Sequence, residues 1–186
     1  QEYTLDEDVA VEAWVVADPT AEAAAHEGDR GIMNTARQAL AADQPGKAQR
    51  AMDKWIPEHD GTANPYLPEA YLIRADSLLA QTYEYKSLFD YERLIRTYPQ
   101  AEEFLVAVER EYDIALKYLN GLRKRFFGIR VVDASDIGIE LIIRVQERVP
   151  GSQLAERAAI DLADYYYGQR EMRLARDAYE LYLLNY

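Results

Sequence analysis

The chain has 186 residues and a mass of 21.3 kDa, a length that suggests one domain or two small ones. It has no cysteine and only two histidines, His26 and His59, which excludes disulfides, cysteine nucleophiles and metal sites made of thiolates or many histidines. No run approaches 18 apolar residues, so the sequence predicts no membrane-spanning helix.

The net charge is −12, from 33 acidic and 21 basic residues. The excess lies mainly in residues 1–29, which contain Asp and Glu but neither Lys nor Arg. Phosphate backbones and anionic lipid headgroups both require a basic surface. We therefore expect no nucleic-acid partner and no strong adsorption to lipid.

Residues 1–28 form the first of two expected parts, an acidic and extended leader in which Val9, Val11, Ala13 and Val15 occur at every second position. The second part, residues 29–186, is expected to be a helical repeat domain. The chain begins with Gln1 rather than Met and ends in an apolar helical pattern. We therefore expect the natural protein to continue beyond this sequence.

From about residue 30, apolar residues recur every three or four positions between breaks that contain Gly or Pro. This spacing predicts an all-α fold, with no convincing β-hairpin and no βαβ unit. The eight expected helices lie near residues 30–43, 45–58, 67–82, 84–97, 101–127, 135–148, 152–168 and 170–185.

A repeat runs through these helices: a small residue, large residues four and seven positions later, and Pro after twelve. It is met by Ser87-Tyr91-Leu94-Pro99, by Gly138-Ile142-Val145-Pro150, by Ala175-Tyr179-Tyr182 and, more loosely, by Ala48-Met52-Trp55. In three cases a small residue also stands twelve positions earlier, at Ala36, Ala75 and Ala163.

Small residues let two helices approach closely, so the repeat predicts about four helical hairpins stacked as an α-solenoid. The third hairpin is expected to be longer and degenerate, because Phe126 occupies its small position.

Six stretches carry a family resemblance: Tyr91–Pro99, Arg110–Ala115, Arg123–Ile129, Pro150–Ser152, Ala155–Ala158 and Ala163–Tyr167. The hairpins resemble tetratricopeptide repeats. More narrowly, residues 46–186 resemble the outer-membrane assembly lipoprotein family, the tetratricopeptide subunit of the β-barrel assembly machinery (BamD-like). Members of that family carry a lipid-modified cysteine at the mature N-terminus, and this chain has no cysteine.

The resemblance implies a non-enzymatic adaptor in the periplasm, associated with the outer membrane through a lipid that this chain does not carry. Its partners would be subunits of the assembly machinery and unfolded outer-membrane proteins. The alternative is a generic tetratricopeptide scaffold in another complex. We expect no cofactor and no catalytic or metal site, because the sequence contains no Gly-rich phosphate loop, no G-x-S-x-G elbow and no His-Glu-x-x-His pair.

In a stack of hairpins the first helix of each pair lines the concave face, which predicts a peptide-binding groove there. The candidate partner-binding residues are Met33, Arg37, Leu40, Leu72, Asp76, Leu79 and Tyr167. Arg37 is the candidate for an acidic or carboxyl-terminated peptide, because guanidinium binds carboxylate with two parallel hydrogen bonds. The alternative is an ordinary solvated surface.

Arg123, Lys124 and Arg125 form the densest basic cluster, a possible docking patch for an acidic partner or for the acidic leader. The alternative is that these cations only stabilise a helix C-terminus through the helix dipole, with Phe126 and Phe127 in the core.

Overall fold

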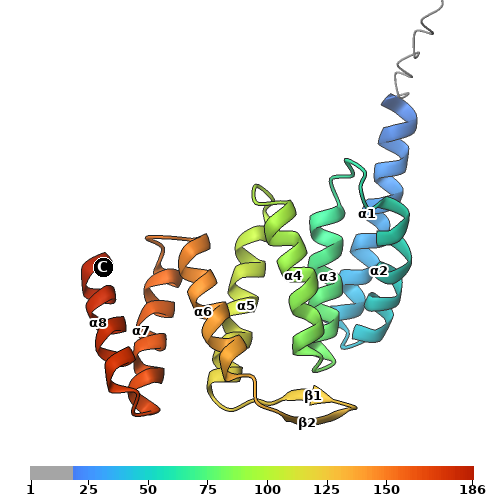
Figure 1. Ribbon diagram of the computed structural model, residues 1–186. Helices are drawn as coiled ribbons and strands as arrows, with labels where there is room; N and C mark the ends of the chain where they lie inside the picture. The colour runs from blue at the N-terminus through green and yellow to red at the C-terminus, as the bar shows by residue number, and fades with distance from the viewer. Residues whose placement is uncertain (1–18) are drawn as a thin grey trace, which may run out of the picture.

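The computed structural model describes residues 19–186, which are mostly helical (Figure 1). This part of the chain forms eight helices and one two-stranded hairpin, and none of its helices is long and apolar enough to span a bilayer. The elements are α1 (Pro19–Ala41), α2 (Pro45–His59), α3 (Leu67–Ala80), α4 (Glu84–Thr97), α5 (Glu103–Leu119), β1 (Lys124–Phe126), β2 (Ile129–Val132), α6 (Ser135–Arg148), α7 (Gln153–Gly168) and α8 (Met172–Asn185).

The helices pack in sequence, each against the next, as a stack of adjacent pairs (Figure 1). The odd-numbered helices also contact one another, α1 with α3, α3 with α5 and α5 with α7. Within residues 19–186 no such contact joins two even-numbered helices. The odd-numbered helices are therefore a closely spaced inner row, and the even-numbered helices are an outer row with wider gaps.

The small residues of the repeat lie at the helix–helix contacts, as predicted. Ala48, Ser87, Gly138 and Ala175 are buried on the second helices, and Ala36, Ala75 and Ala163 are buried on the first. A Cβ atom at Gly138 would lie 3.0 Å from the Ala115 carbonyl oxygen and 2.9 Å from Leu119 Cδ2. Ala115, not Phe126, is therefore the small partner in the third pair, and that pair is packed as closely as the others.

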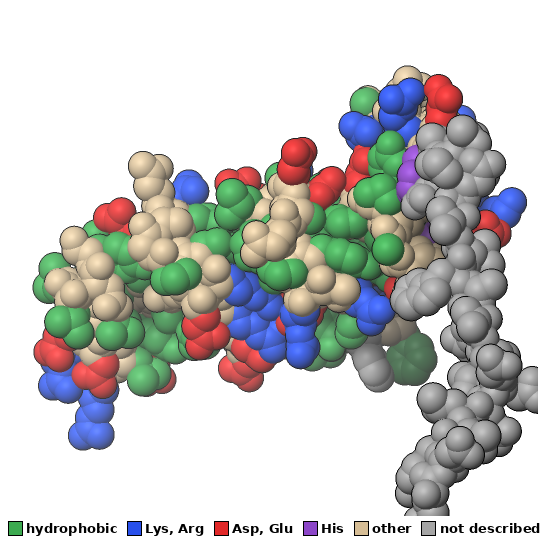
Figure 2. All heavy atoms as spheres, turned by 90° about the horizontal axis from the view of Figure 1, so that it is seen from above, with side chains coloured by type: hydrophobic (Ala, Val, Ile, Leu, Met, Phe, Trp, Pro, Cys, Tyr) green, Lys and Arg blue, Asp and Glu red, His purple; other side chains and the backbone are tan. Residues whose placement is uncertain are grey.

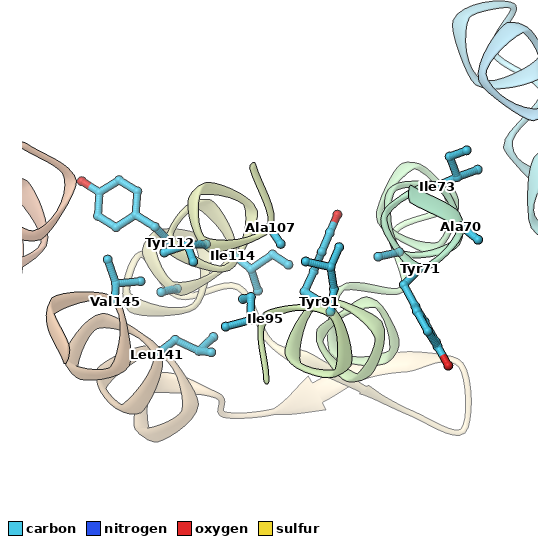
Figure 3. Close-up of a cluster of buried hydrophobic side chains, with 14 of the residues drawn as sticks. Ala70, Tyr71, Ile73, Tyr91, Ile95, Ala107, Tyr112, Ile114, Leu141 and Val145 are labelled. Carbon is cyan, nitrogen blue, oxygen red and sulfur yellow. The ribbon is translucent and has the colours of Figure 1, made fainter. Parts of the chain in front are cut away.

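The apolar side chains between the helices make one continuous core. Figure 3 shows Tyr91 of α4 extending between α3 and α5 beside Ile114, with Ile95 next to it, while Leu141 and Val145 extend the cluster from α6. Each pair thus shares its core with the next, as expected for a helical repeat array.

The predicted helix over residues 101–127 is wrong, because α5 ends at Leu119 and residues 124–132 form a β-hairpin. The hairpin turn is Phe127–Gly128, whose φ angles of 48° and 83° are both positive. Two such residues make the tight turn that matches the twist of paired strands. The prediction missed it because Phe-Gly lacks the usual Asn-Gly or Asp-Gly signature.

The first helix of every pair ends in the same turn. A residue with positive φ follows the helix in each case, namely Asp43, Thr82, Gly121 and Arg170. The next N–H then donates back to the last turn, as from Tyr83 to the Leu78 carbonyl at 2.9 Å. This Schellman arrangement recurs with only one glycine among the four positions, so the turn is set by the geometry of the pair.

The boundary of the leader also differs from the prediction. Helix α1 begins at Pro19 and runs through Gly28 and Gly31, so residues 19–28 are helical rather than extended. Proline is favoured in the first turn of a helix, and α1 buries the apolar Met33 and the hydrogen-bonded Asp29 on one face. Residues 1–18 of the predicted leader lie outside the described part.

Candidate functional site

The predicted groove residues all lie on the inner row, but several are used for packing. Met33 is completely buried, so the prediction that it lines an accessible surface is wrong. Leu40, Leu72 and Leu79 are half-buried against the core. Tyr167 is exposed near the C-terminal end of α7.

The polar residues of the inner row link neighbouring helices. Arg37 Nε lies 2.6 Å from Glu69 Oε1 and joins α1 to α3, while its side chain stays 54% exposed. Asp76 accepts hydrogen bonds from the Tyr91 hydroxyl at 2.6 Å and from Arg110 Nε at 3.2 Å, which joins α3 to α4 and α5. These side chains already have intramolecular partners, so the inner face gains stability from them.

One of these links belongs to the repeat. Tyr179 donates to Asp164 in the fourth pair from the same relative positions as Tyr91 and Asp76 in the second. Burial raises the pKa of Tyr91, and the neighbouring Asp76 carboxylate adds to that rise. The predicted groove residue Asp76 therefore has a structural role in binding the Tyr91 hydroxyl.

The basic cluster lies at the hairpin, not at the end of a helix, and Phe127 is 92% exposed rather than part of the core. The helix-dipole interpretation is therefore wrong. Lys124 Nζ lies 3.4 Å from the centroid of the Tyr85 ring, and Arg125 Nη2 donates to Thr82 Oγ1 at 2.6 Å. Both side chains hold β1 against the start of α4.

Arg130 on β2, which the sequence analysis overlooked, completes the attachment. Its Nη2 donates to both carboxylate oxygens of Glu84, at 2.7 and 2.9 Å, and Glu84 is largely buried. A charged pair in this partly shielded setting is stronger than an exposed one. The hairpin is therefore held in a fixed position on α4.

Apolar side chains project from this fixed hairpin. Phe127, Ile129, Val131 and Val132 are all exposed, and we call them the hairpin surface. Exposed apolar groups of this kind, bordered by charged residues, are typical of protein interaction sites.

A second feature lies beside the hairpin, a cavity of about 320 Å³ between α4 and α6 with α5 as its floor. We call it the α4–α6 groove. It is lined by Tyr85, Leu88, Phe89, Glu92, Glu111, Ile137, Glu140, Leu141 and Arg144. Figure 2 shows a group of Lys and Arg side chains, with acidic ones around it, over the middle of the stack.

Glu111 on the floor of the groove is completely buried. Its Oε2 accepts a hydrogen bond from Arg148 Nη1, and Arg148 Nη2 donates to Glu92. Glu111 Oε1 has no hydrogen-bond partner among the described residues. Burial raises the pKa of Glu111 to about 7, against the opposing effect of Arg148.

A smaller cavity of about 90 Å³ lies under the hairpin and shares Tyr85 with the α4–α6 groove. The buried Tyr118 hydroxyl lacks a hydrogen-bond partner in the described structure, and burial raises its pKa to about 12. A space of this size can hold ordered water for that hydroxyl. Lys124 and Arg125 of the hairpin line the smaller cavity, and Tyr85 joins that cavity to the groove. We call the hairpin surface, this cavity and the groove together the hairpin side.

The two histidines lie elsewhere, around Asp29 in the first pair. Asp29 accepts hydrogen bonds from Trp55 Nε1 at 2.7 Å and from Asn64 Nδ2 at 2.8 Å, and His59 Nε2 lies 3.7 Å away. The carboxylate thus ties α1 to α2 and to the following loop. No group of side chains within residues 19–186 has an arrangement suited to a metal ion.

The sequence did contain a signal for Glu111. It stands four residues before Ala115, as Tyr71 stands four residues before Ala75 in the second pair. A carboxylate at a position that packing reserves for a large apolar or aromatic side chain is unusual. The signal was missed because the small residue of the third pair was placed at residue 126.

No known protein-family model matches the chain. A comparison with curated proteins likewise finds no match.

Proposed function

We propose that this chain is a non-enzymatic adaptor of outer-membrane protein assembly, built of four tetratricopeptide-like helical hairpins that bind other proteins. The observation that carries the proposal is the hairpin side, where apolar side chains are exposed on a hairpin that ion pairs and hydrogen bonds attach to the start of α4, next to a cavity. Such a surface is suited to binding a protein.

The inner face is the weaker binding surface in this proposal. Its charged residues are paired across successive helices, as in Arg37 with Glu69 and Arg110 with Asp76. A partner that replaced these pairs would have to offset their loss. The hairpin surface instead exposes apolar side chains, and Glu111 in the α4–α6 groove keeps an acceptor atom, Oε1, without a hydrogen-bond partner in the described part of the chain.

The partners follow from the family resemblance of residues 46–186. They are the barrel subunit of the assembly machinery and unfolded segments of outer-membrane proteins. In this proposal the protein works in the periplasm and is held at the outer membrane by a lipid on a cysteine upstream of Gln1. Exposed apolar groups at fixed positions favour capture of a segment at modest affinity.

The test uses the native, full-length protein. Membrane fractionation, the intact mass of the mature N-terminus and identification of co-purifying proteins are measured together. The proposal predicts a lipidated protein in the outer-membrane fraction that co-purifies with a barrel-assembly subunit. A cytoplasmic, unlipidated protein with unrelated partners would contradict it and would favour the generic scaffold.

A further inference from the structure

The α4–α6 groove has a specific chemical requirement at its floor. Glu111 is completely buried, and its Oε1 atom has no hydrogen-bond partner in the described part of the chain. A buried carboxylate oxygen without a donor is costly, and native proteins normally satisfy such atoms. The groove above it is large enough for at least one side chain from another molecule.

The charges around Glu111 indicate what kind of group is missing. Both arginines at the groove are already engaged, Arg148 with Glu92 and Glu111, and Arg144 with Glu140 at 2.5 Å. Arg96 approaches Glu92 from outside the cavity at 3.8 Å. Among the described residues that line this groove, the unsatisfied buried atom is Glu111 Oε1, an acceptor on a carboxylate, so a cationic donor complements it best.

The walls of the groove indicate the shape of the missing group. Leu88, Ile137 and Leu141 provide aliphatic surface, and Phe89 is 63% exposed at the rim. Phe89 packs edge-to-face on Tyr85, with ring centroids 5.4 Å apart. An arginine side chain combines an aliphatic stem with a planar cation that stacks on aromatic rings, whereas lysine has no such plane.

We propose that the α4–α6 groove binds an arginine side chain of a partner protein, whose guanidinium donates to Glu111 Oε1 while its stem packs against Phe89 and Leu141. This inference rests on the proposed adaptor function and identifies the chemistry by which the adaptor recognises a partner. The hairpin surface then contacts the apolar residues that flank the arginine.

The probe is a capped peptide, acetyl-Leu-Arg-Leu-amide, titrated into the ¹⁵N-labelled full chain at pH 8 and followed by NMR. The matched peptides replace Arg with citrulline, which keeps the shape without the charge, or with Lys. We expect the Arg peptide to bind about tenfold more tightly than the citrulline peptide, as for one charge-assisted hydrogen bond. The amide signals of Phe89, Glu111 and Leu141 should move.

Two variants test the contacts separately. Phe89→Ala removes an exposed wall residue and should weaken binding of the Arg peptide about fivefold or more, and Glu111→Gln should abolish the preference for Arg over citrulline. Leu105→Ala is the matched control, because Leu105 is 58% exposed on α5 but does not line the groove. If Glu111→Gln does not fold, the Phe89→Ala variant and the comparison of the Arg, citrulline and Lys peptides still test whether the groove binds arginine.

If the peptides bind, three results would overturn the inference: equal binding of Arg and citrulline peptides, equal or tighter binding of the Lys peptide, or signal changes that spare both the groove and the hairpin surface. No binding of any peptide would also overturn it and would leave a cavity filled by water. These results are separate from the fractionation and co-purification experiment, which tests the adaptor function without reference to this groove.

Discussion

The gap between α2 and α4 and the gap between α4 and α6 are built alike, because an inner helix forms the floor of each. In the first gap, Arg74 of α3 donates to both carboxylate oxygens of Asp90 at 2.8 and 2.6 Å and lies 3.7 Å from Asp53. In the second, Glu111 of α5 satisfies only one of its oxygens and borders a cavity. The carboxylate of Asp90 in the first gap is thus satisfied through both oxygens, whereas that of Glu111 in the second keeps one buried oxygen without a hydrogen-bond partner in the described residues.

The largest effect is expected at the ion pairs of the second gap. Arg148→Ala leaves Glu111 buried without its cationic partner, and we expect a loss of about 3 kcal/mol in the free energy of unfolding. Chemical denaturation measures the loss. Arg144→Ala is the control, because Arg144 is more exposed and should cost less than about 1 kcal/mol. Equal losses for the two variants would contradict the central role of Glu111.

The pH dependence of stability tests Glu111 itself. Burial raises its pKa from the ordinary 4.5 to about 7, so the native state keeps a proton that the unfolded chain has already lost. This contribution to stability is complete below pH 4.5 and is lost as the pH rises through 7.

From pH 5 to pH 8 we therefore expect the wild type to lose about 2–3 kcal/mol relative to Glu111→Gln. Parallel stability curves for the two proteins, from denaturation at each pH, would contradict a buried carboxyl with a raised pKa.

The close approach of α5 and α6 under the groove depends on Gly138. Gly138→Ala places a methyl group against the Ala115 carbonyl oxygen and the Leu119 side chain, and we expect a loss of about 1–2 kcal/mol. Gly31→Ala should instead gain about 0.5–1 kcal/mol, because a Cβ at Gly31 meets no atom within 4 Å. Thermal denaturation of both variants checks that one loses and the other gains stability. A gain in stability for Gly138→Ala would contradict the prediction and show that α5 and α6 can move apart to accept the methyl group.

The smallest effect is expected on the inner face. The Arg37 side chain is more than half exposed, so removing its pair with Glu69 in Arg37→Ala should cost no more than about 0.5 kcal/mol. The same variant should bind the Arg peptide as the wild type does, because Arg37 lies on α1, outside the groove. Weaker binding of the Arg peptide by Arg37→Ala would instead indicate that the peptide binds on the predicted concave face.

The helix pairs could be predicted from the sequence because their signals are local. Small residues such as Ser87 and Ala175 stand at a constant distance from large ones, and turns with Gly or Pro separate the helices. The hairpin could not be predicted in the same way, because Phe127 adopts a positive φ that is uncommon for its residue type. A helix that continues to residue 127 puts the small position of the third pair at residue 126. The repeat then does not identify Ala115 as the small residue or Glu111 as the residue four positions before it.

The candidate site could not be predicted from the sequence for a different reason. Whether an inner-row residue is accessible depends on the distance between helices, and Met33 is buried where a regular pattern placed it on the surface. The α4–α6 groove likewise arises from the wider spacing of the outer row, to which residues as distant as Tyr85 and Arg144 contribute. Tertiary packing, not local pattern, determines both.

The most direct test of where partners bind is photo-crosslinking in the native cell. A photoreactive amino acid replaces Phe89 in the α4–α6 groove, Phe127 on the hairpin surface or Arg37 on the inner face of the full-length protein. We predict that positions 89 and 127 crosslink to the same barrel-assembly subunit and that position 37 gives little product. Crosslinks to that subunit from position 37 alone would contradict a partner-binding role for the hairpin side.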